Sequence, residues 1–195
     1  MNPLQLILGD EEFLIDRATS SIIRAVRSTM QSNPEELPIT KLRAGDVTPS
    51  EISELLSPSL FAEDRVVILA AAGEAGKEAV STIEQAVKEP APGVVLIVIH
   101  SGGGRAKNLV KILKNAGADV TECPKLTKFS EREDFVVNEF RNLGVRPSRD
   151  TVHALLDAIG GDLRELASAV SQLVADTGGR VDPAAVRLYY AGIAG

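Results

Sequence analysis

Apolar runs alternate with longer amphipathic stretches over the first two thirds of the chain. The short runs predict buried strands, and the stretches with apolar residues three and four positions apart predict helices. Residues 94–99 form the most apolar run, which is typical of a central strand buried on both faces. The predicted strands are 4–8, 39–42, 65–69, 94–99 and 119–122. Their alternation with helices predicts an α/β fold with a mostly parallel sheet covered on both faces.

Capping residues and helix breakers mark the helices between these strands. Thr48-Pro49-Ser50-Glu51 is a capping box with proline at the first helical position. Gly76 precedes another helix, and the Pro90-Ala91-Pro92-Gly93 segment ends it. The predicted helices of this part are 11–30, 49–56, 77–88 and 106–116.

After Pro124 the pattern predicts helices only. Ser130 and Glu133 are expected to form a capping box, and the helix that they open ends near Gly144. The three later helices are expected to begin after Ser148, Asp162 and Asp182. The sequence therefore predicts an α/β domain over residues 1–126 and a small all-α domain over residues 127–195. Residues 191–195 look like a linker.

Composition narrows the function classes. The 195 residues are long enough for one large domain or two small ones, and they are 44% hydrophobic and 25% charged, as in an ordinary soluble protein. A net charge of −6 argues against an independent nucleic-acid-binding module, although it permits local basic patches. The single Cys123 excludes an internal disulfide and fits a reducing compartment. With no apolar run of membrane-spanning length and no secretory signal, a cytoplasmic protein is expected.

The turn after the first strand is unsuited to nucleotide phosphates. A working phosphate loop needs glycines, a lysine and a hydroxyl. Here Asp10, Glu11 and Glu12 follow Gly9, and no lysine is present. The carboxylates would repel a triphosphate, and their ordinary role is to complement a helix N-terminus. We therefore expect no bound nucleotide and no other cofactor.

A second glycine-rich segment, residues 101–107, follows the most apolar strand. Its spacing fits neither standard glycine motif, so a flexible loop with a solvated basic end is the simpler interpretation. The alternative is contact between Arg105 and Lys107 and an anion or the DNA backbone. Cys123 has no metal-ligand spacing to either histidine, and no catalytic constellation is recognisable. No metal site and no catalytic residue are therefore expected.

Two large apolar residues, Leu60 and Phe61, fall in a connection where such side chains are least expected. Pro58 ends the preceding helix, and a strand begins at Arg65. The pair is either tucked under its own loop or offered to a partner pocket, and position alone favours the first.

The chain resembles the delta subunit of the bacterial DNA polymerase III clamp loader from residue 4 to about residue 191. The opening Leu6-Ile7-Leu8-Gly9-Asp10-Glu11-Glu12-Phe13-Leu14 is similar to that family's first strand and turn, and Ser59-Leu60-Phe61 to its clamp-contacting element. Phe129-Ser130-Glu131-Arg132-Glu133, then Gly144-Val145 and Gly160-Gly161-Asp162-Leu163-Arg164-Glu165-Leu166, resemble its second domain. The order and spacing of these segments carry the resemblance.

The resemblance implies an AAA+-like fold without a working phosphate loop, followed by a helical lid domain. It implies a role in DNA replication, in which Pro58, Ser59, Leu60 and Phe61 bind the sliding clamp (beta) and favour an open ring for loading onto primed DNA. Pro58 departs from the family's pattern and is expected to stiffen this element. The other partners implied are the gamma/tau and delta prime subunits and, through the assembled complex only, DNA. ATP hydrolysis would belong to partner subunits. No membrane is involved.

The family also carries a third, collar domain that joins the subunits into a ring. Nothing in the sequence follows the fourth short helix, so we expect a fragment of the first two domains that binds the clamp without assembling a stable loader. The resemblance places the chain in the DNA polymerase III holoenzyme, a nucleotidyltransferase, with no catalysis of its own. Two other classes stay open: a nucleotide-binding protein of the same fold, which requires ATP affinity, and a nucleic-acid-binding adaptor, which requires salt-dependent DNA affinity.

Overall fold

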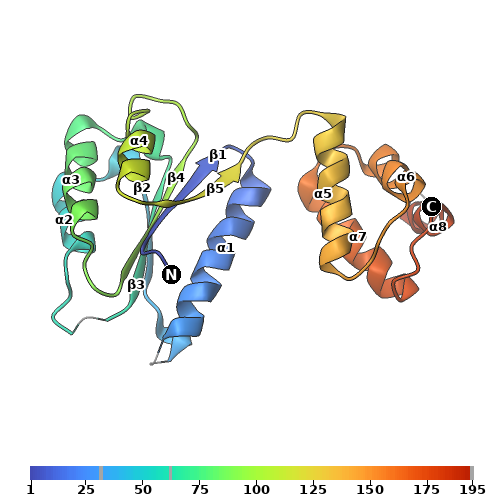
Figure 1. Cartoon of the computed structure of the whole chain (residues 1–195), viewed down its shortest axis with the longest axis horizontal. Coiled ribbons are helices and arrows are strands. Elements are labelled where there is room, and N and C mark those ends of the chain that lie inside the picture. Colours follow the sequence, from blue (N-terminus) through green and yellow to red (C-terminus); the bar gives the residue numbers. More distant parts are fainter. Residues whose placement is uncertain (31–32, 62, 194–195) are drawn as a thin grey trace. The chain divides into compact units, whose positions relative to one another are not determined.

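The structure is a computed structural model that describes residues 1–30, 33–61 and 63–193. The chain divides into two compact units, Met1–Lys125 and Leu126–Gly195 (Figure 1). The boundary inferred from the sequence, between residues 126 and 127, lies one residue farther along. No helix among the described residues is long and apolar enough to cross a membrane.

The first unit is built on a five-stranded sheet in which every neighbouring pair is parallel. The strands are β1 (Leu4–Gly9), β2 (Ile39–Arg43), β3 (Arg65–Ala70), β4 (Val94–His100) and β5 (Asp119–Cys123). Their order is β2-β3-β4-β1-β5, so the most apolar strand, β4, is central, as predicted. Ile97 and Val98 point to opposite faces of β4 and are both fully buried.

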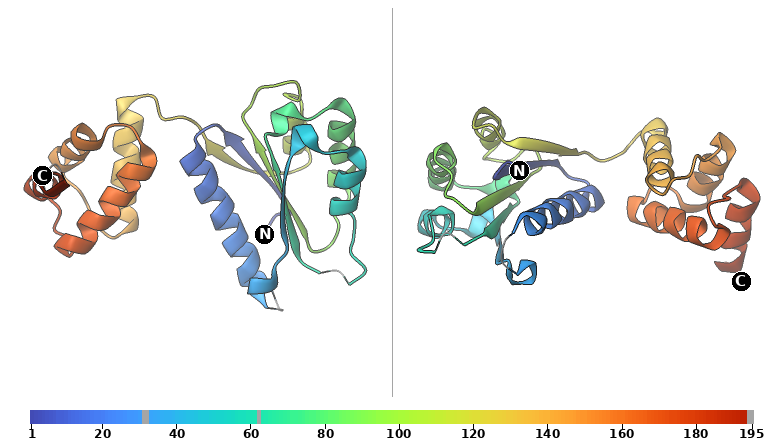
Figure 2. Two further views of the ribbon diagram at one scale, coloured as in Figure 1. Left: turned by 180° about the vertical axis from the view of Figure 1, so that it is seen from behind. Right: turned by 60° about the horizontal axis from the view of Figure 1, so that its bottom comes forward.

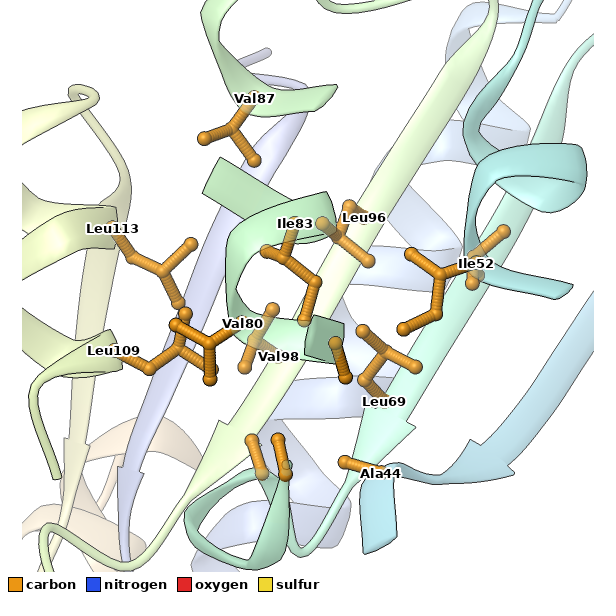
Figure 3. Packing of buried hydrophobic residues seen from close by; sticks show 14 of the residues in the cluster. Ala44, Ile52, Leu69, Val80, Ile83, Val87, Leu96, Val98, Leu109 and Leu113 are labelled. Carbon is orange, nitrogen blue, oxygen red and sulfur yellow. The ribbon is translucent and has the colours of Figure 1, made fainter. Parts of the chain in front are cut away.

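Helices cover both faces of the sheet, as the sequence predicted (Figure 2). On one face, α1 (Glu12–Thr29) packs its Val26 against Ile7 and Ile97. On the other face lie α2 (Pro49–Leu56), α3 (Lys77–Lys88) and α4 (Leu109–Asn115). There Ile52, Ile83 and Leu109 from these helices meet the strand residues in one aliphatic core (Figure 3).

Three short 3-10 helices, Pro34–Glu36, Ala44–Asp46 and Ala72–Glu74, lie in the connections of this unit. The third of them explains why α4 begins at Leu109 and not at residue 106 as predicted. The backbone N–H of Ala106 donates to the carbonyl of Gly73 at 2.8 Å, and Gly102 and Gly104 have positive φ angles. These bonds and turns hold residues 101–108 in a non-helical path.

The second unit is all-helical, as predicted. It consists of α5 (Phe129–Asn142), α6 (Arg149–Ile159), α7 (Leu163–Thr177) and α8 (Pro183–Ile193). Phe140, Leu155 and Leu166 are fully buried side chains of this unit. Ser148, Asp162 and Asp182 each accept a backbone N–H in the first turn that follows, at 3.1, 3.0 and 2.7 Å, so these predicted start signals are confirmed.

Two predictions for this unit are wrong. The capping box of Ser130 and Glu133 does not form, because α5 begins at Phe129 and the Glu131 carboxylate accepts the backbone N–H of Lys128 at 3.0 Å. Glu133 instead lies 2.7 Å from Nε2 of His153 on α6. The predicted linker is also wrong over residues 191–193, which continue α8, while residues 194–195 lie outside the described part of the chain.

Candidate functional site

The connection between α2 and β3 displays two apolar side chains to solvent. Leu60 is 98% exposed and Phe61 is 82% exposed. The interpretation that the pair is tucked under its own loop is therefore wrong. Ala62, the next residue of this motif, lies outside the described residues. We call residues 57–64 the anchor loop.

Local hydrogen bonds give the anchor loop its shape. α2 ends at Leu56, and the Ser57 hydroxyl donates to the carbonyl of Glu54 at 2.8 Å. Pro58 is exposed, and it follows Ser57 in extended geometry, as the residue before a proline prefers. The half-buried Ser59 accepts the backbone N–H of Glu63 at 3.0 Å. Ser59 therefore closes the tip of the loop by an internal bond.

Arg65 follows the anchor loop and contacts its first residue, a role that sequence reasoning missed. Its guanidinium Nη2 donates to the carbonyl of Ser57, and its backbone N–H donates to the carbonyl of Gly93 at 2.9 Å. Val66, Val67, Ile68 and Leu69, which follow it in β3, are buried apolar residues. The only sequence signal for this role was that a charged residue begins an otherwise apolar strand.

The opposite end of the sheet holds the other predicted sites. β1 and β4 are neighbours, but α1 follows β1 on one face and α4 follows β4 on the other. In open α/β sheets, ligands bind at such a switch point, beyond the carboxyl ends of the strands. The anchor loop precedes β3 and so lies at the amino ends. The two candidate sites therefore occupy opposite ends of the sheet (Figure 1).

The turn after β1 is closed by its own backbone and acidic side chains. Gly9 has a φ of +143°, and a Cβ added there would lie 2.0 Å from the carbonyl oxygen of Cys123. The backbone N–H of Glu11 donates to that same oxygen at 3.0 Å. The Glu11 carboxylate accepts the backbone N–H of Phe13 and lies 3.7 Å from Nζ of Lys125. Glu11 thus caps α1, as the acidic turn led us to expect.

An open groove of about 700 Å³ lies at the switch point beside this turn. Three lysines line it, Lys107, Lys111 and Lys114, together with the carboxylates of Asp10 and Glu122. We call it the lysine groove. Sequence reasoning missed Lys111 and Lys114, although in the helix predicted from residue 106 their spacing from Lys107 would have placed all three on one side.

Arg105 and Lys107, which the sequence proposed as joint anion contacts, do not converge. The guanidinium Nε of Arg105 donates to the carbonyl of Glu74 at 2.6 Å, which directs the side chain to the Ala72–Glu74 turn. Lys107 lines the lysine groove, and Arg105 does not. Within the lysine groove, Lys107 therefore lies with Lys111 and Lys114 and not with Arg105.

The remaining polar candidates have structural explanations. His100 is fully buried; its Nδ1 accepts the backbone N–H of Gly102 at 2.8 Å, so its Nε2 donates to the carbonyl of Ala106 at 2.9 Å. It thereby fixes the rim of the lysine groove. Burial raises the pKa of the Cys123 thiol, which disfavours the nucleophilic thiolate. Among the described residues, no group of His, Cys, Asp and Glu is arranged to hold a metal ion.

The family model for the DNA polymerase III delta subunit matches residues 6–124. This span includes the sheet from Leu6 on, the anchor loop and the lysine groove. The chain belongs to the DNA polymerase III delta-subunit family. The match was expected from the order of the sequence segments, and it covers more than half of the 195 residues.

This delta-family chain is similar in fold to solved structures of other proteins. The Bacillus subtilis DNA clamp loader delta protein (YqeN) is 22% identical, with a TM-score of 0.75, and the match covers 96% of this chain and 58% of that one. The Thermotoga maritima RuvB Holliday junction branch migration motor is 11% identical, with a TM-score of 0.49, over 94% of this chain and 59% of that one. The delta-family chain thus spans less than two thirds of either protein. No curated protein matches it.

Proposed function

We propose that this chain binds a sliding clamp through the anchor loop and acts as the clamp-opening part of a clamp loader. The observation that carries the proposal is the exposure of Leu60 and Phe61, 98% and 82%, inside the span matched by the delta-subunit family. Large adjacent apolar side chains held in solvent are typical of anchors that enter a hydrophobic pocket on a partner.

The two anchors would supply a large part of the energy that specific binding requires. Burying a Leu or Phe side chain completely contributes about 1.5 to 3 kcal/mol each. Two such anchors together supply about 3 to 6 kcal/mol, before the costs of association are subtracted. The pair would thus form the energetic centre of an interface whose other contacts add shape and specificity.

The aliphatic core supports the helix that leads into the anchor loop. Ile52 of α2 is 1% exposed and packs in the aliphatic core, while α2 leads directly into the anchor loop. Ring opening would follow from differential affinity, because a ligand shifts an equilibrium only toward the state that it binds more tightly. The chain would bind the open clamp interface better than the closed one. ATP hydrolysis is assigned to partner subunits, and no residue of this chain is assigned a catalytic role.

The test of this function is binding to the sliding clamp of the same organism. Purified chain is titrated into purified clamp by isothermal titration calorimetry, and complex formation is checked by gel filtration. Saturable binding supports the proposal. Absence of binding at the highest clamp concentration attainable would overturn the clamp role for this chain.

The lysine groove supports a second, weaker function in DNA contact. Lys107, Lys111 and Lys114 bring three positive charges to one open surface, with Asp10 and Glu122 limiting the local excess to about one. The net charge of −6 makes strong binding by the isolated chain unfavourable. We propose that this groove contacts a DNA backbone within the assembled loader, where other subunits add to the affinity.

Reversing the charges in the lysine groove tests this second function. In the chain with Lys107→Glu, Lys111→Glu and Lys114→Glu, DNA affinity at low salt should fall, and the slope of log affinity against log salt should decrease by about one for each phosphate that is no longer neutralised. Fluorescence anisotropy with labelled primed DNA measures both. The matched control reverses three exposed lysines outside the groove, Lys41 on β2 and Lys77 and Lys88 on α3. Equal reductions in both variants would contradict a specific contact.

A further inference from the structure

The anchor loop holds Leu60 and Phe61 away from the body of the domain, so only the loop backbone sets their position. Both side chains are more than four-fifths exposed. A free loop would sample many conformations, and ordering it at the moment of binding would reduce affinity. Contacts that fix the backbone beforehand therefore matter more here than in a loop that packs on its own domain.

Two cross-connections close the anchor loop. The outer one joins the Ser59 hydroxyl to the backbone N–H of Glu63 at 3.0 Å. The inner one joins the Arg65 guanidinium to the carbonyl of Ser57, where α2 ends. Arg65 also begins β3, and its backbone N–H bonds to Gly93, directly before β4. Arg65 therefore connects Ser57, the first residue of the loop, to the sheet.

The surroundings of Arg65 are difficult to explain by stability alone. It is half-buried at the head of a strand whose next four residues are buried and apolar. Its Nε is buried and has no hydrogen-bond partner among the described residues. A buried donor without a partner costs folding free energy, so an apolar side chain would suit the sheet better. Unlike an apolar side chain, the arginine donates a hydrogen bond to the Ser57 carbonyl.

We infer that Arg65 is a positioning residue for clamp binding: it pre-organises the anchor loop so that Leu60 and Phe61 are presented in one arrangement. The inference rests on the proposed clamp function. Arg65 itself need not contact the clamp. Its effect is to lower the ordering cost of the loop, which raises the affinity for any partner that takes both anchors together.

The variants Arg65→Ala and Arg65→Lys test the inference by two readouts. The first readout is clamp affinity, which we expect Arg65→Ala to weaken about tenfold. This factor corresponds to the cost of ordering one to two side chains on binding. Arg65→Lys keeps a donor for the Ser57 carbonyl and should recover most of the loss. Far-ultraviolet circular dichroism and thermal unfolding establish that each variant is folded.

The second readout needs no clamp, so it separates this inference from the proposed function. The chain has no tryptophan, and Phe61→Trp therefore places a single fluorescent reporter at the loop tip. Time-resolved anisotropy should show faster local motion of this tryptophan when Arg65→Ala or Ser59→Ala is added. Ser59→Ala removes the outer cross-connection without altering the sheet and shows how the loop moves when one bond is lost. If Arg65→Ala fails to fold, Arg65→Met, which lacks the guanidinium but keeps an apolar stem, decides the matter.

The outcomes are distinct. Faster loop motion together with weaker clamp binding, both restored by Arg65→Lys, would support the inference. Unchanged loop motion in the folded Arg65→Ala and Ser59→Ala variants would overturn it. A loss of affinity that Arg65→Lys does not restore and that follows the loss of thermal stability would also overturn it, since Arg65 would then be only structural. If the parent chain binds no clamp, the proposed function fails, and unchanged or faster loop motion still decides whether Arg65 orders the loop.

Discussion

The combined Leu60→Ala and Phe61→Ala variant is expected to lose at least about a hundredfold in clamp affinity while keeping its fold. The two side chains are 98% and 82% exposed, so the domain gains little from them. Their burial in a partner pocket would contribute about 3 to 6 kcal/mol, and each 1.4 kcal/mol is about tenfold in affinity. Calorimetric titration measures the affinity, and circular dichroism with thermal unfolding measures the fold.

A matched control comes from exposed leucines of the helical unit. Leu143 and Leu188 are 46% and 77% exposed. Replacing both with alanine removes two exposed apolar side chains outside the anchor loop, and we expect clamp affinity to stay unchanged. Equal weakening in the two double variants would show that Leu60 and Phe61 have no special role. Unfolding of the Leu60 and Phe61 variant would show that the pair stabilises the domain.

Gly9→Ala is expected to lower the free energy of unfolding by more than about 3 kcal/mol. The new Cβ would lie 2.0 Å from the Cys123 carbonyl oxygen, in a backbone conformation with φ of +143° that L side chains rarely adopt. Strain of this kind costs about 1 to 3 kcal/mol by itself, and the overlap adds to it. β1 and β5 would have to separate at Gly9 and Cys123, where they pair. Urea denaturation followed by circular dichroism measures the change.

Two other glycines separate overlap from backbone strain. Gly103 has no positive φ, and no atom lies within 4 Å of the Cβ that alanine would add, so Gly103→Ala should change stability little. Gly117 has a φ of +88° but equally open surroundings, so Gly117→Ala should show the strain alone. Similar losses at Gly9 and Gly117 would contradict the packing of β1 against the Cys123 carbonyl.

Most of the fold could be predicted because its signals are local. The helix at Pro49–Leu56 agrees with its prediction to the residue, since a capping box opens it and Ser57-Pro58 ends it. The central place of β4 was predictable because a strand covered on both faces must be apolar throughout. The all-helical second unit followed from capping residues and glycines. Each of these signals acts over a few neighbouring residues.

The errors arise where a distant residue competes for a local group. The start of α4 moved because the carbonyl of Gly73 takes the N–H of Ala106. The capping role expected of Glu133 failed because α5 begins at Phe129, which puts Glu131 in that position, and Glu133 pairs instead with His153 on another helix. Sequence periodicity does not reveal such pairings, since the partners lie 33 and 20 positions apart.

The candidate site was predictable in part. Leu60 and Phe61 stood out because they are large apolar residues in a connection, but their exposure required the structure. The role of Arg65 depends on the path of the loop, which brings Ser57 back beside the start of β3. The anion contact of Arg105 stays a prediction, and the sequence did not reveal that a backbone carbonyl of a distant turn binds its Nε.

Site-specific photocrosslinking tests the central claim most directly. A photoreactive phenylalanine analogue replaces Phe61 in one preparation and Leu188 in another; these residues are 82% and 77% exposed and lie in different units. Each is irradiated with the sliding clamp, and crosslinked peptides are identified by mass spectrometry. The account predicts an efficient crosslink from position 61 to an apolar pocket of the clamp, which an excess of unlabelled chain suppresses, and little from position 188. Equal crosslinking from both positions, or none from position 61 under conditions where the chain binds, would contradict it.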